Sequence, residues 1–83
     1  MLTILYFAWV RERVGVSQEK VAPPTLGTVA ELADWLMTQS ADHRAALGDR
    51  ERLRVAVDQQ FAGWDASVEG AREVAFFPPV TGG

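Results

Sequence analysis

The residues best suited to chemistry stand at the end of the 83-residue sequence, in the run Pro78-Pro79-Val80-Thr81-Gly82-Gly83. Gly83 carries an α-carboxylate that no side chain shields, so the catalytic groups of another protein could approach it closely. A carboxylate becomes an acyl donor only when one oxygen is made a good leaving group, as in an acyl adenylate. The activated carbon could then accept sulfur to give a thiocarboxylate, or an amine to give an amide. We therefore expect Gly83, preceded by Gly82, to be the reactive residue.

The prolines in this run predict how the reactive end is presented. Pro78 and Pro79 each fix φ and favour extended geometry before them, which makes the base of the segment stiff. The two glycines have no Cβ and give a thin tip. We expect a domain over residues 1–77 and a flexible C-terminal tail over residues 78–83 that enters a narrow channel of another protein.

Other kinds of site find little support in the sequence. The one histidine, His43, lies in a polar stretch without a second ligand nearby, so we expect no bound metal there. The sequence contains no cysteine, which excludes a disulfide, a thiol nucleophile and a thiolate metal site. No carboxylate pair, serine–histidine arrangement or phosphate-binding loop is recognisable. We therefore expect that the chain is not an enzyme by itself and binds no cofactor.

Composition narrows the class of protein further. Eight Lys and Arg residues against 11 Asp and Glu give a net charge of -3, which argues against a nucleic-acid partner. The longest apolar run, Leu2 to Val10, is about half of the roughly 20 residues that span a membrane, so we expect no membrane association. Without disulfides, stability must come from packing alone, which suits the reducing cytoplasm.

The pattern of apolar residues predicts the elements that hold the tail. Thr28 and Glu31 form a capping-box pattern before a helix over Val29–Met37, whose apolar residues recur every three or four positions. A strand is expected at each end of the chain, over Leu2–Val10 and Glu73–Phe77. The remaining expectations are a strand over Val16–Ala22 paired with the first, a helical turn within Ser40–Arg52, a half-buried strand over Leu53–Val57 and an edge element within Phe61–Val68.

This order predicts an α+β fold. A helix between the second strand and a later one is the crossover that parallel strands require. One mixed sheet with one main helix across a single face is the β-grasp, or ubiquitin-like, arrangement.

Two stretches of the sequence resemble one known family. The C-terminal run from Glu73 to Gly83, with its Phe-Phe-Pro-Pro-Val-Thr-Gly-Gly end, is similar to that of the small, sulfur-carrier subunit of molybdopterin synthase, the MoaD family. The opening Leu5-Tyr6-Phe7-Ala8-Trp9-Val10-Arg11-Glu12, followed by Gly15, resembles the first strand and turn of that family. Two departures concern turns: Asp58 stands where the family commonly has Asn, and Ala71-Arg72 replaces its usual Gly-Asp.

The resemblance implies a mechanism and partners. An ATP-dependent, E1-like activating enzyme adenylates the carboxylate of Gly83, and a sulfur donor converts it to a thiocarboxylate. The tail then enters the large subunit of molybdopterin synthase and delivers sulfur to cyclic pyranopterin monophosphate. Two small and two large subunits form the family's heterotetramer. ATP is used by the activating enzyme rather than bound by this chain.

Alternation along the strands predicts the surface that meets these partners. If even-numbered side chains of the first strand face the helix, Leu5, Phe7 and Trp9 face away from it, as does Phe77 of the last strand. Phe7 and Phe77 would then share an exposed apolar patch if the two strands were neighbours. The resemblance implies a docking surface at the positions of Phe7, Arg11, Phe61 and Phe77, continued by the tail residues Pro78, Pro79, Val80 and Thr81.

Other functions remain open at this point. The chain could be a ubiquitin-like modifier whose Gly83 becomes linked to lysines of other proteins, or a sulfur carrier for another pathway such as thiamine synthesis or tRNA thiolation. It could also be a plain binding module. Appending one residue after Gly83 should abolish activation of a carrier or modifier and change little for a binding module.

Overall fold

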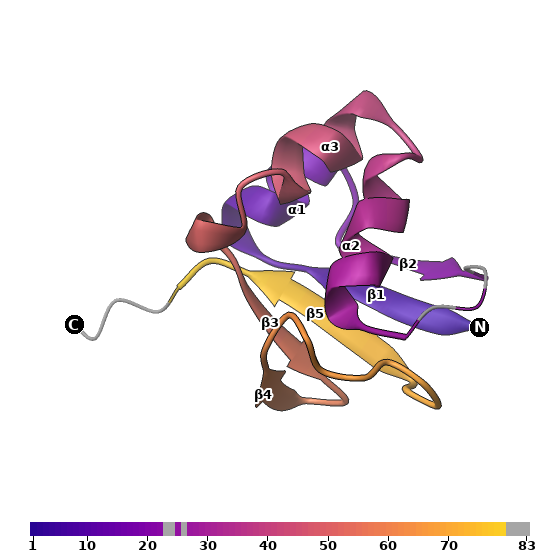
Figure 1. Ribbon diagram of the computed structural model, residues 1–83. Coiled ribbons are helices and arrows are strands. Elements are labelled where there is room, and N and C mark those ends of the chain that lie inside the picture. The colour runs from indigo at the N-terminus through magenta and orange to yellow at the C-terminus, as the bar shows by residue number, and fades with distance from the viewer. Residues whose placement is uncertain (23–24, 26, 80–83) are drawn as a thin grey trace.

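The computed structural model describes residues 1–22, 25 and 27–79 (Figure 1). These residues form a five-stranded mixed sheet in the order β2-β1-β5-β3-β4. Three helices, α1, α2 and α3, lie together on one side of the sheet. The strands are β1 (Leu2–Tyr6), β2 (Gln18–Val21), β3 (Arg54–Val57), β4 (Gln60–Ala62) and β5 (Glu73–Phe77), and the helices are α1 (Ala8–Val14), α2 (Val29–Met37), α3 (Ala41–Leu47) and the short 3-10 helix η1 (Arg50–Arg52).

Strand β5 lies at the centre of this sheet. It pairs parallel with β1, where Tyr6 lies opposite Phe76, and antiparallel with β3, where Val55 lies opposite Phe76. The parallel pair requires a crossover, and the helices between β2 and β3 contribute to that connection. The predicted α+β, β-grasp fold is therefore confirmed, with the difference that three helices rather than one main helix cover the sheet.

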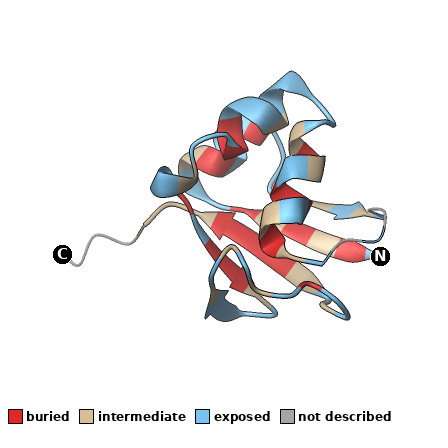
Figure 2. Ribbon diagram, in the orientation of Figure 1, coloured by how far each residue is buried: buried red, intermediate tan, exposed pale blue. Residues whose placement is uncertain are grey.

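The hydrophobic core lies between the sheet and the helices, where Figure 2 shows the facing sides of both layers as buried. The even-numbered residues of β1 supply it as expected, because side chains alternate between the two faces of a strand. Val74 and Phe76 of β5 are fully buried on the same face. From the helices, the core receives Val10, Val14, Val29, Leu32, Ala33, Leu36, Ala46 and Leu47.

The predicted strand over Leu2–Val10 is wrong in its second half. Strand β1 ends at Tyr6, and α1 begins at Ala8 and ends before Gly15, whose φ of 99° is the left-handed conformation of a helix C-cap. Val10 and Val14 are both buried, since a spacing of four places them on one face of a helix. The nearly continuous apolar run is compatible both with the alternation of a strand and with the spacing of a helix. Packing of Val10 and Val14 against the core selects the helix. Strand β2 still pairs antiparallel with β1, across a connection that contains α1.

The helix at Val29–Met37 has the predicted bounds and the predicted start. The Thr28 hydroxyl accepts a hydrogen bond from the backbone of Glu31 (3.2 Å), and the Glu31 carboxylate accepts one from the backbone of Thr28 (3.0 Å). The helical turn expected in Ser40–Arg52 is a full helix, α3, capped by Ser40. Among the described residues, no helix combines the length and the apolarity needed to cross a bilayer.

The two departures in turn sequence both lie at one end of the sheet. Asp58 and Gln59 have φ values of 49° and 70°, the left-handed pair that a tight turn between β3 and β4 requires. Asp58 Oδ1 accepts hydrogen bonds from the backbone of Arg72 (2.8 Å) and Glu73 (3.0 Å). Gly70 supplies the positive φ (76°) in the loop before β5, so Ala71-Arg72 needs no left-handed residue.

Candidate functional site

The candidate site begins where β5 brings the chain to the edge of the sheet. The backbone N–H of Phe7 donates to the carbonyl of Phe76 (3.2 Å), and Arg54 lies opposite Phe77 on the other side. Pro78 and Pro79 follow, half-buried and without an N–H to continue the pairing. The strand therefore ends at Phe77 as predicted. The residues Val80, Thr81, Gly82 and Gly83 lie outside the described residues, so the tail and its reactive end stay predictions.

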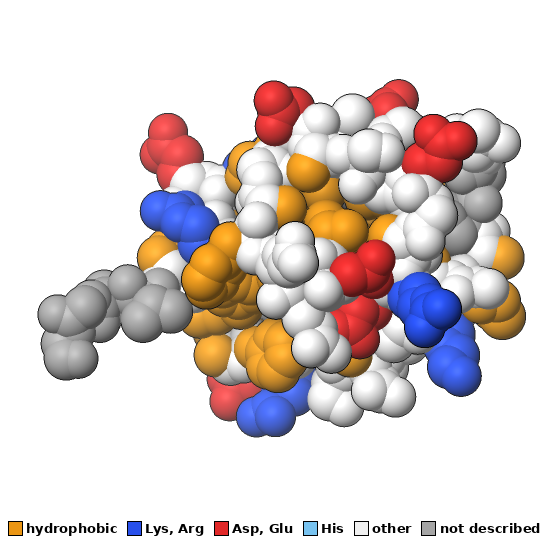
Figure 3. All heavy atoms as spheres, turned by 90° about the horizontal axis from the view of Figure 1, so that it is seen from below, with side chains coloured by type: hydrophobic (Ala, Val, Ile, Leu, Met, Phe, Trp, Pro, Cys, Tyr) orange, Lys and Arg blue, Asp and Glu red, His pale blue; other side chains and the backbone are white. Residues whose placement is uncertain are grey.

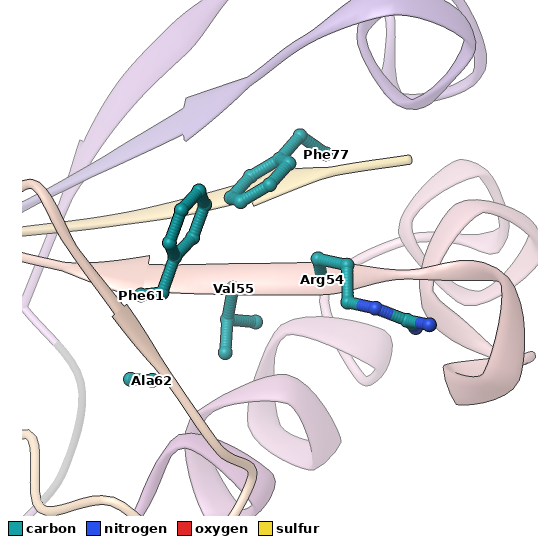
Figure 4. A pocket seen from close by; sticks show the side chains of 5 residues that line it. All are labelled: Arg54, Val55, Phe61, Ala62 and Phe77. Carbon is teal, nitrogen blue, oxygen red and sulfur yellow. The ribbon is translucent and has the colours of Figure 1, made fainter. Parts of the chain in front are cut away.

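Three aromatic residues lie around this strand end: Phe61 and Phe77, whose rings are neighbours, and Phe7, whose backbone N–H donates to the carbonyl of Phe76 and whose side chain is exposed. We call Phe7, Phe61 and Phe77 the aromatic surface. The rings of Phe61 and Phe77 lie 5.8 Å apart at an angle of 44°, and Figure 4 shows them pointing toward one another from β4 and β5. They border a shallow groove of about 260 Å³ that is also lined by Arg54, Val55 and Ala62.

Strand register explains how two residues so far apart in the sequence meet. Phe61 lies opposite Ala56, and the alternation of β3 places Ala56 and Arg54 on the outer face. Ala56 is small, so the rings of Phe61 and Phe77 can approach each other across β3. The short edge strand β4 thus holds Phe61 beside the strand that leads to the tail.

The aromatic surface is open to solvent. Phe61 is 83% exposed and Phe7 48%, so both side chains are accessible to a partner. Figure 3, which views the molecule from below, shows hydrophobic side chains gathered on this face with Lys and Arg side chains on either side. An apolar patch with a charged border is the usual appearance of a protein-binding surface.

Of the predicted docking residues, Arg11 stands apart from the aromatic rings. It lies on α1 rather than in a turn, and its backbone N–H donates to the carbonyl of Phe7 (3.4 Å). Its side chain is exposed, and no contact found among the described residues joins it to Phe61 or Phe77. The structure therefore brings Phe61 and Phe77 together and places the backbone of Phe7 beside β5. Arg11 lies on the adjoining helix α1.

The sequence interpretation missed a second group of residues near this site. Trp9 was expected on the outer face of a strand, but it lies half-buried on α1 with the guanidinium groups of Arg13 and Arg52 over its ring. The spacing of four between Trp9 and Arg13 is the signal that could have indicated this contact, because such residues are neighbours on a helix. Arg52 belongs to η1, and no local sequence pattern predicts its contact with Trp9.

The titratable groups with shifted pKa values lie away from the aromatic surface. Burial, and then the carboxylate of Glu19 that accepts its hydrogen bond (2.8 Å), raises the pKa of Tyr6 far above its usual value. Glu19 also binds Nε2 of His43 (2.7 Å), so this network joins β1, β2 and α3. Within residues 1–22, 25 and 27–79, no group of three or more His, Cys, Asp or Glu side chains is placed to hold a metal ion.

Comparison with known proteins identifies the family. Residues 4–83 match the model of the ThiS family. The molybdopterin synthase sulfur carrier subunits of Escherichia coli and Haemophilus influenzae are 42% and 35% identical to this chain over 83 residues, which are the full length of each protein.

Solved structures agree on the fold. The crystal structure of SAMP1 from Haloferax volcanii superposes with a TM-score of 0.73 at 25% identity, covering 99% of this chain and 98% of that one. A chain in the crystal structure of the BexX/CysO complex from Amycolatopsis orientalis has a similar fold, with a TM-score of 0.69 at 22% identity over the whole of both chains. With its β-grasp fold and two full-length curated relatives, this chain belongs to the ThiS family, among the MoaD-type sulfur carriers.

Proposed function

We propose that this chain carries sulfur for molybdopterin biosynthesis on the carboxylate of Gly83. The observation that supports this most directly is the 42% identity, over the full length of both chains, to a molybdopterin synthase sulfur carrier subunit. The position of β5 is consistent with the proposal, because the centre of the sheet anchors the strand that leads to Gly82 and Gly83.

The proposed chemistry has two activation steps and one transfer. A carboxylate oxygen of Gly83 attacks the α-phosphorus of ATP on the activating enzyme, and pyrophosphate leaves. A sulfur nucleophile then attacks the acyl carbon, AMP leaves, and a thiocarboxylate remains. In the large synthase subunit, the thiocarboxylate sulfur bonds to a carbon of cyclic pyranopterin monophosphate and displaces an oxygen substituent there. Water then hydrolyses the resulting thioester, which leaves the sulfur on the pterin and returns Gly83 to a carboxylate.

The chain and its partner proteins have different parts in this proposed chemistry. We assign the catalytic side chains and the ATP to partner proteins, so that this chain is not an enzyme by itself and binds no cofactor. Its own part is a folded domain over residues 1–77 that is recognised, and a flexible tail over residues 78–83 that delivers the sulfur. We place this chemistry in the cytoplasm, where the activating enzyme finds ATP.

Docking is proposed to occur at the aromatic surface beside the tail. Phe61 and Phe77 offer a groove with an exposed aromatic rim, and the exposed Phe7 lies between β1 and α1. Aromatic side chains carry much of the binding energy at protein interfaces. We assign Arg11 to the border of this interface, and Pro78, Pro79, Val80 and Thr81 to the channel of the large subunit, in a heterotetramer of two small and two large subunits.

Intact-mass spectrometry of the protein purified from its native host tests the proposal. We expect a fraction whose mass reflects one oxygen replaced by sulfur, localised to Gly83 by fragmentation. A variant that lacks Gly83 is the matched control and should carry no such replacement. Isopeptide adducts of Gly83 to lysines of other proteins, with no thiocarboxylate, would show a protein modifier instead.

A further inference from the structure

A cluster of cationic side chains lies next to the aromatic surface and has a different composition. Its centre is Trp9 on α1, which packs against the core along part of its surface and is half-exposed. The guanidinium carbon of Arg13 lies 5.4 Å from the centre of the Trp9 ring, and that of Arg52 lies 5.0 Å from it. We call Trp9, Arg13 and Arg52 the tryptophan–arginine cluster.

The tryptophan ring has two positive charges within cation–π distance. A guanidinium group over an aromatic face is attracted to the negative charge of that face, which keeps a long and otherwise mobile side chain in place. Because both cations lie at the same ring, an anion that approaches this ring is attracted by two positive charges. The cluster is therefore ordered before any partner arrives, and it favours a negatively charged one.

The acidic residues of the described part of the chain do not neutralise this cluster. The ion pairs found there join Glu19 to His43 and Asp34 to Arg50. Glu12 and Glu51 are direct neighbours of Arg13 and Arg52 in the sequence, and adjacent residues on a helix do not face each other. Within the described residues, no carboxylate lies within ion-pair distance of Arg13 or Arg52.

Charge is distributed unevenly over the chain. The net charge is -3, yet the segments 11–13 and 50–54, whose Arg13 and Arg52 meet at Trp9, hold five of the eight Lys and Arg residues. Two acidic residues, Glu12 and Glu51, lie in the same segments, and Arg50 is paired with Asp34, so a positive excess remains. An acidic protein that concentrates its arginines at one place presents a local positive potential there. Guanidinium groups match carboxylates in geometry, since they can donate two parallel hydrogen bonds.

The cluster is continuous with the aromatic surface. Phe7 directly precedes α1, and Arg54, two residues after Arg52, lines the groove with Phe61 and Phe77. A protein that covers the aromatic surface and accepts the tail from β5 would also reach the cluster. The large synthase subunit is the partner that must hold the tail throughout sulfur delivery, so we take it as the occupant.

We propose that the tryptophan–arginine cluster binds an acidic segment of the large synthase subunit, with Arg13 and Arg52 donating to its carboxylates. This proposal rests on the proposed function, and it adds a second, electrostatic contact to the aromatic one. Paired charges of this kind accelerate association and orient the partner more than they strengthen the final complex.

The test measures association of the full-length chain with the large subunit of the same organism by surface plasmon resonance, at low and high salt. The double variant Arg13→Glu, Arg52→Glu should raise Kd about tenfold at low salt, mainly through a slower association rate. The difference should shrink at high salt, because ions screen exposed charges. Lys20→Glu, on β2 at the other edge of the sheet, is the matched control and should change Kd less than about twofold.

Several results would overturn this proposal. One is a double variant that binds the large subunit with an unchanged Kd. Another is an equal loss of affinity with Lys20→Glu, which would reflect the net charge of the chain rather than this cluster. A defect that appears only with the activating enzyme would assign the cluster to that protein instead.

Thermal unfolding of each variant shows whether the fold is intact. The double variant Arg13→Lys, Arg52→Lys keeps both charges and should restore most of the association rate. Failure of the proposed function gives a different result, because the wild-type chain would then carry no thiocarboxylate on Gly83.

Discussion

Asp58 is the residue whose single side chain connects two turns. Its carboxylate accepts hydrogen bonds from the backbone of Glu73 and Arg72, so the turn after β3 is tied to the start of β5. The Glu73 and then the Arg72 N–H groups hold the pKa of this carboxyl below its ordinary value of 3.8. Because β5 leads to the candidate tail, Asp58 fixes the far end of the strand that presents it.

The lowered pKa predicts how the stability contributed by Asp58 depends on pH. In the unfolded chain the carboxyl has its ordinary pKa, so its stabilising effect is complete above about pH 4 and is lost as the pH falls through the lower folded value. Asp58→Asn keeps an oxygen acceptor and tolerates the positive φ, but carries no charge. We expect the wild type to exceed this variant in urea midpoint at pH 7, and the two to converge as the pH falls through the lowered pKa of Asp58.

The two substitutions at this position separate charge from backbone strain. Asp58→Ala removes the acceptor and places a residue with a Cβ in a left-handed conformation, so it should be the less stable variant at every pH. A difference between wild type and Asp58→Asn that does not change with pH would contradict the role assigned to the charge.

Among the elements, α1 depends most on one glycine. Gly15 ends the helix in a left-handed conformation, and its N–H donates to the carbonyl of Arg11 (2.8 Å). This C-cap follows Val14 directly, so it also sets where the last core residue of α1 lies. The same short helix carries Trp9 and Arg13 on its outer side, which makes its end important for both the core and the cluster.

Gly15→Ala should destabilise the protein by about 1 kcal/mol, because the left-handed conformation is costly for a residue with a Cβ. A Cβ at this position would meet no atom within 4 Å, so the cost comes from the backbone and not from a clash. Gly15→Asn should lose less, since Asn tolerates this conformation better. Chemical denaturation followed by circular dichroism measures both variants. Equal stability of wild type and Gly15→Ala would show that α1 can end in another way.

At the scale of the whole molecule, the hydrophobic core and the aromatic surface proposed for docking lie on opposite sides of the sheet. The core between sheet and helices holds Leu32 without exposure, whereas Phe61 stands on the outer face, 83% exposed. A domain of this size has a free energy of unfolding of about 4 to 12 kcal/mol. Most of that free energy comes from the helix side, which leaves the outer face available for docking.

One pair of variants tests this separation. Leu32→Ala should cost about 2 to 5 kcal/mol, because it leaves a cavity in the core. Phe61→Ala should change stability by less than about 0.5 kcal/mol. It should weaken binding to the large synthase subunit about tenfold, equivalent to about 1.4 kcal/mol. Urea denaturation and calorimetric titration give the two quantities. A Phe61→Ala variant that binds as tightly as wild type would contradict the proposed docking surface.

The amino-acid sequence by itself determined the elements whose signals are local. Thr28 and Glu31 cap α2 through contacts three residues apart, and alternation in Glu73–Phe77 places Val74 and Phe76 inward whatever the neighbouring strands are. The C-terminal run and the opening of the chain were enough to indicate the family, which the full-length relatives confirm. These features depend on short stretches of chain, so the sequence could predict them.

Tertiary structure alone decided the features that need two distant segments. The run that contains Val10 fits a strand or a helix equally well, and only the core that receives Val10 and Val14 selects the helix. Phe61 meets Phe77 because β3 separates β4 from β5 by one strand, and Arg52 reaches Trp9 because η1 follows the helix that packs on α1. Packing between segments is a long-range property of the chain, and for that reason the contact between Phe61 and Phe77 and the tryptophan–arginine cluster became visible only in the folded molecule.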